Sequence, residues 1–280
     1  MSSVWEEVEI ATSWGTIRGK KTGTGATKVL GVHGWLDNAN TFDRILPLLT
    51  FDFTCISIDL PGHGKSDHFG PSFLYDPRGY VGAVKKVVDS LEWKEFVYLG
   101  HSMGAVVGII YCSIFPSDVT SFISIDIIKV WSFEAEEYPQ RLRKYFELYF
   151  DNEKKCSLPP LSYTKSVLIQ KMIQGSGGSL DESSADVLFD RGVTKILQKE
   201  GKETVQKEGE EENKLQEKEG TVEEKLDQEE KFSLTRDLRA KVYFIGFTST
   251  EGWQEFARNI TCPLLIIKVD MPVESNKIIT

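Results

Sequence analysis

The 280-residue sequence predicts an α/β fold in which helices cover both faces of a mostly parallel sheet. Short apolar runs rich in Val, Ile and Leu alternate with segments whose apolar residues recur with the period of an α-helix. Strands that are apolar along their whole length are typical of parallel sheets that are buried on both faces. A hydrophobic content of 40% is enough for a substantial core.

The expected strands follow one another along the chain. Short, partly alternating patterns in residues 5–18 indicate an antiparallel hairpin, and a Gly-rich turn comes after it. The next two apolar runs end at His33-Gly34-Trp35 and at Pro61-Gly62-His63-Gly64, as buried strands do where they meet a loop. The expected strands after the hairpin are Lys28–Val32, Phe53–Leu60, Phe96–Leu99, Ser121–Ile128 and Pro263–Lys268.

Three helices are expected between these strands. Residues 41–49 place apolar side chains at i, i+3, i+4 and i+7, which is one face of a helix. Residues 80–91 repeat that period, with Lys85, Lys86 and Asp89 on the other side. Residues 105–115 are apolar almost all round, which predicts a helix buried on most of its surface.

The domain organisation follows from where this alternation stops. Residues 1–130 form the N-terminal part of the core, and residues 260–280 hold another core strand and a divergent tail. Residues 131–259 are expected to be a mostly helical cap over the carboxyl edge of the sheet. Within it, residues 199–231 carry 13 acidic and 7 basic side chains, a net charge of −6. So few apolar residues predict a disordered segment or a solvated, transient helix.

Composition limits the partners and the compartment. A net charge of −9 argues against nucleic acid or an anionic membrane as a partner. The N-terminus has no signal-peptide pattern, and no apolar run is long enough to span a bilayer. Without a C-x-x-C spacing, the four cysteines are expected to be free thiols in a reducing compartment. These cysteines are Cys55, Cys112, Cys156 and Cys262. We expect a cytoplasmic, non-secreted protein, with a peroxisomal or vesicle-associated location as the alternative.

Gly100-His101-Ser102-Met103-Gly104 fits the G-x-S-x-G pattern of a nucleophile elbow. The strand-like FVYL directly before it and the helical AVVGII after it supply the structural context that the pattern needs. The two glycines permit the sharp turn from strand to helix. Ser102 is therefore the predicted nucleophile, placed where exposed N–H groups at a helix N-terminus favour negative charge.

His33-Gly34-Trp35 follows an earlier strand, where the second half of an oxyanion hole is expected. The backbone N–H groups of Trp35 and Met103 would then converge on the tetrahedral oxygen. His33, His63 and His101 are interpreted as structural hydrogen-bonding residues, and His68 as solvent-exposed.

These segments together resemble a known family. HGWLDNANTFDRILPLL, IDLPGHGKSDH and YLGHSMGAVVG resemble the α/β-hydrolase superfamily, and most closely the serine hydrolase-like proteins related to the Kraken hydrolase. The resemblance is strong over about residues 4–130 and weaker around ITCPLLIIK. It implies an α/β-hydrolase fold with Ser102 as nucleophile and Trp35 and Met103 as oxyanion donors. Serine at the elbow also points away from dehalogenases and epoxide hydrolases, which use an aspartyl ester.

The chain departs from the family in its last part. The family order is nucleophile, acid and then a late histidine, but no histidine follows His101 here, so the histidine base is absent. This predicts a C-terminally truncated or alternatively spliced form without the last strand and helix, ending in the divergent tail DMPVESNKIIT. The acid is Asp126, after the strand that follows the elbow helix, or Asp270, after the next strand.

The leading functional hypothesis is hydrolysis of a small-molecule carboxylic ester or thioester by acyl transfer, with no metal and no cofactor. The alternative is a catalytically inactive isoform or pseudoenzyme that retains a binding pocket. A haloperoxidase or a carbon–carbon bond hydrolase on the same scaffold is a third possibility. The sequence leaves the physiological substrate and the oligomeric state open.

Overall fold

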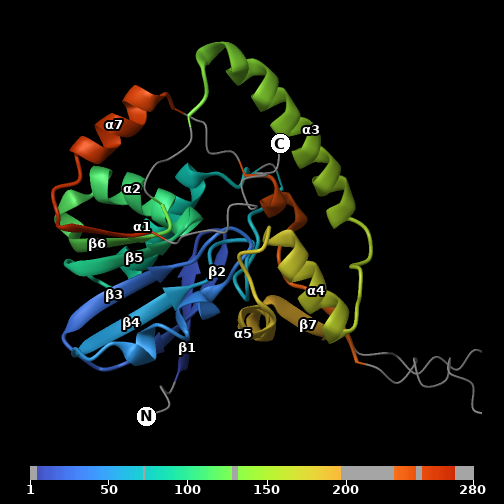
Figure 1. Ribbon diagram of the computed structural model, residues 1–280, viewed down its shortest axis with the longest axis horizontal. Coiled ribbons are helices and arrows are strands. Elements are labelled where there is room, and N and C mark those ends of the chain that lie inside the picture. The colour runs from blue at the N-terminus through green and yellow to red at the C-terminus, as the bar shows by residue number, and fades with distance from the viewer. Residues whose placement is uncertain (1–4, 72, 128–131, 197–229, 244–247, 269–280) are drawn as a thin grey trace, which may run out of the picture.

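The computed structural model describes residues 5–71, 73–127, 132–196, 230–243 and 248–268. A seven-stranded sheet runs through the core in the order β1-β2-β4-β3-β5-β6-β9 (Figure 1). β1 pairs with β2, and β2 with β4, in antiparallel fashion, and the remaining neighbours are parallel. The strands are β1 (Glu6–Thr12), β2 (Gly15–Thr22), β3 (Thr27–Val32), β4 (Phe53–Ile58), β5 (Phe96–His101), β6 (Val119–Ile125) and β9 (Leu264–Ile267). The predicted α/β-hydrolase type of sheet is confirmed.

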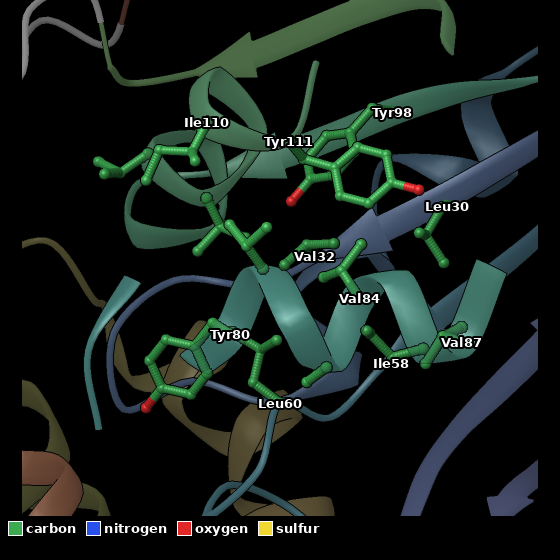
Figure 2. Packing of buried hydrophobic residues seen from close by; sticks show 14 of the residues in the cluster. Leu30, Val32, Ile58, Leu60, Tyr80, Val84, Val87, Tyr98, Ile110 and Tyr111 are labelled. Atoms are coloured by element: carbon green, nitrogen blue, oxygen red, sulfur yellow. The ribbon is translucent and has the colours of Figure 1, made fainter. Parts of the chain in front are cut away.

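Three helices pack together on one face of the sheet: α1 (Pro77–Ser90), α2 (Met103–Ile114) and α7 (Thr250–Arg258). α1 begins at Asp76, whose carboxylate accepts hydrogen bonds from the N–H groups of Arg78 and Gly79. Figure 2 shows Val84 and Val87 of α1 among strand side chains such as Leu30 and Ile58. This is the largest apolar cluster of the described residues.

The opposite face differs from the sequence prediction. Residues 41–49 do not form an α-helix but two short 3-10 helices, η1 (Ala39–Phe42) and η2 (Leu46–Leu48). Pro47 lies inside the expected helix and has no N–H to donate, so an α-helical ladder does not continue through it. Phe42 and Leu46 still pack on the sheet, against a second cluster that includes Val29 and Cys55.

The region between β6 and β9 contains the expected helices, α3 (Tyr138–Cys156), α4 (Lys165–Gly175) and α5 (Glu182–Gly192). All three lie beside the sheet in Figure 1, and α4 packs against α5. The antiparallel pair of β7 (Val193–Ile196) and β8 (Lys231–Leu234) and the 3-10 helix η5 (Leu238–Lys241) were not predicted from the sequence. Lys231, the last residue of the predicted charged segment, begins β8, while residues 199–229 lie outside the described residues.

Two parts of the predicted cap interval pack with the core. Trp253 of α7 and Ala240 of η5 belong to the largest apolar cluster, and α7 lies against α2. The assignment of residues 131–259 to the cap does not include these core contacts, because helical periodicity does not reveal which layer a helix joins. Apart from that, the division into domains stays a prediction, as does the absence of a last strand and helix. None of the described helices combines the length and the apolar character needed to cross a membrane.

Candidate active site

Ser102 lies in the turn between β5 and α2, at the carboxyl edge of the sheet. Its backbone has φ 48° and ψ −112°, a conformation that a residue with a side chain rarely adopts. The Ser102 N–H donates to the carbonyl of Ile125 in the neighbouring strand at 2.9 Å, which holds the strained residue in place. The Ser102 hydroxyl has no hydrogen-bond partner among the described residues.

The two glycines of the elbow are required by close approach. A Cβ on Gly104 would lie 2.0 Å from the carbonyl oxygen of Val32, and one on Gly100 would lie 2.7 Å from the Cα of Ala105. Both contacts are far inside van der Waals distance. The start of α2 therefore rests directly on the end of β3 and on β5, and this contact brings Ser102 next to the loop that follows β3.

The two predicted oxyanion donors have free N–H groups. Met103 is the first residue of α2, where an N–H has no intrahelical acceptor. Trp35 lies in the loop after β3, and neither its N–H nor that of Met103 is paired within the described part of the chain. The Trp35 indole Nε1 donates to the carbonyl of Ala240 at 2.9 Å, which fixes the loop against η5.

His33 and His63 have the structural roles that the sequence predicts. The His33 ring is fully buried, donates from Nδ1 to the carbonyl of Gly34 at 2.7 Å and accepts at Nε2 from the N–H of Leu60 at 2.9 Å. Burial lowers the pKa of His33, so both bonds are made by a neutral imidazole. The His63 ring is also fully buried, and its Nδ1 donates to the carbonyl of Pro61 at 3.1 Å.

His68 and His101 both face carboxylates. His68 is exposed, as the sequence predicts; it lies 3.4 Å from Asp237 and contacts the carbonyl of Thr235 at 2.9 Å. His101 Nδ1 lies 3.3 Å from Asp37 Oδ2. No histidine ring in the described structure is hydrogen-bonded to the Ser102 hydroxyl.

Asp126 directly follows β6 and has φ 71°. Its N–H donates to the carbonyl of Ile267 at 2.8 Å. The residue before Asp126 is Ile125, whose carbonyl accepts the Ser102 N–H. The Asp126 carboxylate accepts no hydrogen bond from the described residues, so it is neither a helix cap nor a loop hydrogen-bonding group there. Asp270 lies outside the described residues. The assignment of the acid stays a prediction.

The buried carboxylate of Asp59, which follows β4, was not predicted from the sequence. Its oxygens accept from the N–H groups of Ala39 at 2.7 Å and Lys65 at 2.9 Å, and from Arg191 Nε at 2.7 Å. The Asp59 and Arg191 side chains are 0% and 3% exposed, so α5 is fastened to the core by a buried ion pair. Asp59 lies at the carboxyl end of a strand, and this position is the signal in the sequence that could have indicated a buried anchoring carboxylate.

A second anchor was also missed in the sequence TRDLR. The Asp237 carboxylate accepts from the Tyr75 hydroxyl at 2.9 Å and from Arg239, whose NH2 group also donates to the carbonyl of Phe69 at 2.6 Å. This network holds η5 against the loop before α1, and Ala240 of η5 in turn holds Trp35. Within the described residues no cluster of His, Cys, Asp and Glu has the arrangement of a metal site.

Comparison with known proteins agrees with this geometry. Residues 28–181, more than half of the chain, match the α/β hydrolase fold family. The chain belongs to the α/β hydrolase family. This α/β hydrolase contains the elbow of the family between β5 and α2, with serine as its central residue.

Relatives of this α/β hydrolase include proteins named as serine hydrolases. It is 30% identical over 267 residues to a "probable serine hydrolase" of Drosophila melanogaster, an alignment that covers 94% of this chain and 71% of that protein. It is 35% identical over 193 residues to the human "serine hydrolase-like protein 2", covering 68% of this chain and 61% of that protein. A hypothetical protein of Pseudomonas aeruginosa PAO1 shares the fold, with a TM-score of 0.75, 22% identity and coverage of 94% and 81%.

Proposed function

We propose that this α/β hydrolase is a serine hydrolase that cleaves a carboxylic ester or thioester by acyl transfer. The observation that carries the proposal is the strained Ser102 at the N-terminus of α2, beside two unpaired N–H groups. In the first step the Ser102 oxygen attacks the substrate carbonyl and loses its proton, and the alcohol or thiol departs with a proton. Water then attacks the acyl-serine and releases the acid.

Charge on the tetrahedral intermediate is stabilised by backbone groups in this proposal. The N–H groups of Trp35 and Met103 donate to the oxyanion, and the N-terminus of α2 adds a favourable field. Asp126 or Asp270 is the proposed acid that would orient a base for the serine proton, and none of the four histidines of this sequence is assigned as that base. The names of the Drosophila and human relatives support a serine hydrolase, and the human relative extends well beyond the aligned region.

One observation favours a second candidate for the 280-residue chain, a binding form without turnover. His33 uses both ring nitrogens elsewhere, His63 is buried, and His68 and His101 face carboxylates, so no described histidine is placed to take the serine proton. Removing the histidine of a triad leaves only about 10³- to 10⁴-fold acceleration over water. Ser102 and the two unpaired N–H groups could then still bind a carbonyl compound without turning it over.

The test uses a short-chain p-nitrophenyl ester and a fluorophosphonate probe, because both report on an activated serine whatever the natural substrate is. The 280-residue chain is expected to turn over the ester at a rate close to that of buffer and to label slowly at Ser102. Free imidazole in the buffer supplies a base, so it should accelerate labelling. Ser102→Ala, the control, should not label under either condition.

Two results would contradict this mechanism. If imidazole leaves labelling of Ser102 unchanged, the serine is not poised for acyl transfer and the binding form is the better description. If the chain labels rapidly without imidazole, one of its four histidines acts as the base. Single substitutions of His33, His63, His68 and His101 would then show which.

A further inference from the structure

Strained backbone is concentrated around Ser102. Within the described part of the chain, four residues other than glycine have a positive φ: Leu36, Glu92, Ser102 and Asp126. Three of them follow the ends of the neighbouring strands β3, β5 and β6, while Glu92 lies after α1. Such strain persists where the surrounding structure holds it, and it gathers at functional sites. Leu36 therefore indicates a functional reason for the shape of the loop after β3.

Leu36 lies in a tight turn that carries the proposed oxyanion donor. The Asp37 N–H donates to the carbonyl of Gly34 at 3.3 Å, which closes a β-turn over residues 34–37 with Trp35 and Leu36 at its centre. Leu36 has φ 60°, a value that turns of types II and I′ need at this position and that glycine or asparagine normally supplies. Because the Cβ of leucine opposes this conformation, contacts outside the turn have to hold it.

The oxyanion donor and the turn share a peptide plane. The Gly34 carbonyl and the Trp35 N–H belong to one planar trans unit, so they point in opposite directions and rotate together. The carbonyl accepts hydrogen bonds from His33 Nδ1 at 2.7 Å and from the Asp37 N–H at 3.3 Å. Whatever holds Asp37 in place therefore helps to set the direction of the Trp35 N–H.

The Asp37 side chain fastens the turn to the elbow. Its Oδ2 lies 3.3 Å from His101 Nδ1 and accepts a hydrogen bond from the Thr41 hydroxyl at 3.4 Å. The Asp37 and His101 side chains are 17% and 31% exposed, so the contact is partly shielded from water. A Cβ on Gly34 would lie 2.8 Å from His101 Nδ1, so the turn rests directly on the imidazole. Because His101 precedes Ser102, the contact links the two sides of the proposed oxyanion hole.

The charge of Asp37 by itself works against the proposed reaction. A carboxylate beside an oxyanion hole repels the negative charge that develops on the tetrahedral intermediate. If Asp37 acted through its charge alone, removing it would speed the reaction. If it holds the turn, removing it lets the Trp35 N–H rotate away from the oxyanion and slows the reaction. The two roles predict opposite effects of the same substitution.

We propose that Asp37 and His101 form a positioning pair, which ties the strained turn of residues 34–37 to the nucleophile elbow and so holds the Trp35 N–H in the direction that an oxyanion needs. Neither side chain touches the reacting atoms. The effect on the reaction rests on the proposed function, because it needs Ser102 as nucleophile. The effect on the direction of the Trp35 N–H does not.

The kinetic experiment measures labelling of Ser102 by a fluorophosphonate in buffer that contains imidazole, over a range of probe concentrations. Asp37→Ala should lower the maximal labelling rate by about tenfold or more, since losing a whole oxyanion donor costs about 10²- to 10³-fold and a misdirected donor costs part of that. The probe concentration at half-maximal rate should change by less than about twofold, because the hydrogen bond to the oxyanion forms in the transition state.

Two further variants calibrate this result. Asp37→Asn keeps one side-chain oxygen for His101 and Thr41, so its maximal rate should fall between those of Asp37→Ala and the original chain. Asp89→Ala, at the exposed end of α1, is the matched aspartate control and should label like the original chain. His101→Ala combined with Asp37→Ala should label no more slowly than the slower single variant, because each substitution breaks the same contact.

Three kinetic results would overturn the proposal. Labelling that is unchanged or faster in both Asp37 variants would mean that the carboxylate does not hold the donor. A higher half-maximal concentration at an unchanged maximal rate would mean that Asp37 serves probe binding instead. Losses that multiply in the double variant would show that Asp37 and His101 act separately.

The direction of the Trp35 N–H bond provides a direct readout, because residual dipolar couplings in an aligned sample report it. Labelling tryptophan with nitrogen-15 restricts the signals to six residues, and Trp35→Phe assigns those of Trp35. In Asp37→Ala the backbone coupling of Trp35 should change. Its indole coupling should stay, since the Ala240 carbonyl holds the indole at 2.9 Å. The other tryptophans show whether the fold is intact.

The couplings also separate this proposal from the proposed function. An unchanged backbone coupling of Trp35 would overturn the positioning pair, and a change in both Trp35 couplings would reduce Asp37 to a general support of the loop. If Ser102 of the original chain does not label even with imidazole, the hydrolase mechanism fails, while the couplings still decide whether the pair holds the turn. If Ser102 labels equally fast in every variant, the mechanism stands and the positioning pair is wrong.

Discussion

His101 Nδ1 lies 3.3 Å from Asp37 Oδ2, and this contact joins the residue before Ser102 to the loop that carries Trp35. A Cβ on Gly34 would lie 2.8 Å from His101 Nδ1 and 2.9 Å from Asp37 Oδ2, so glycine leaves room for the pair. Burial acts to lower the pKa of His101, but the Asp37 carboxylate outweighs it and the pKa is raised. The contact therefore strengthens when His101 is protonated.

The raised pKa gives the stability a definite dependence on pH. The contribution of the pair is fully present below the unfolded pKa of about 6.5 and is lost as pH rises through the higher folded pKa. The difference in melting temperature between the original chain and Asp37→Asn should be larger at pH 5.5 than at pH 8. Imidazole signals in NMR should report a lower His101 pKa in Asp37→Asn. A difference that is constant with pH would show that the two side chains are not coupled.

The elbow glycine provides a test of the close packing around Ser102. Gly104→Ala places a Cβ 2.0 Å from the Val32 carbonyl oxygen, which forces α2 away from β3. We expect a loss of about 3 kcal/mol or more in the free energy of unfolding, measured with urea. Gly82→Ala is the matched control, because a Cβ there meets nothing within 4 Å on the exposed side of α1. It should raise stability by about 0.5–1 kcal/mol. Similar losses in both variants would contradict the packing argument.

The sequence predicts the elements whose signals are local. The strand at 28–32 and the elbow at 100–104 are found because apolar runs, glycines and the adjoining helix pattern lie next to one another. The helix at 41–49 is wrong because the apolar spacing outweighed Pro47. The β7–β8 hairpin was missed because four-residue strands flanking a charged segment have almost no periodicity of their own.

Contacts between distant residues lie beyond such reasoning. Asp59 and Arg191 are 132 positions apart, and no pattern in either segment indicates that they meet. The same holds for Trp35 and Ala240, which are 205 positions apart and meet through the hydrogen bond of the Trp35 indole. The sequence therefore predicts the elbow and the loop beside it, but not the long-range contacts that hold the surrounding segments in place.

The Asp59–Arg191 pair should be strongly coupled because both side chains are buried. Arg191→Met leaves the Asp59 carboxylate buried without its cation, at a cost of about 3–5 kcal/mol in the free energy of unfolding. Adding Asp59→Asn to that variant should recover part of the loss, as a double-mutant cycle in urea would show. The contact of Arg191 with Glu7 is the internal control, because Glu7 is 53% exposed. Glu7→Gln should cost less than about 1 kcal/mol.

The edge strand β9 should make the chain prone to self-association. Its four side chains are 38–54% exposed, and β6 is its only neighbour in the described sheet, so one row of backbone groups is open to pairing. Light scattering of the purified chain should therefore rise with concentration. A monodisperse sample with a cooperative thermal transition at high concentration would contradict this expectation.

Two lysine substitutions on β9 separate association from folding. Leu265 lies on the side of the strand away from α7, so Leu265→Lys should suppress scattering and leave the melting temperature within a few degrees of the original, because a charge on an open edge opposes strand pairing. Leu264 lines a groove of about 300 Å³ with Trp253 and Ile109, so Leu264→Lys should lower the melting temperature by placing a charge against apolar side chains. If scattering instead rises in each variant in step with its loss of stability, association proceeds from unfolded chains rather than through the edge of the folded sheet.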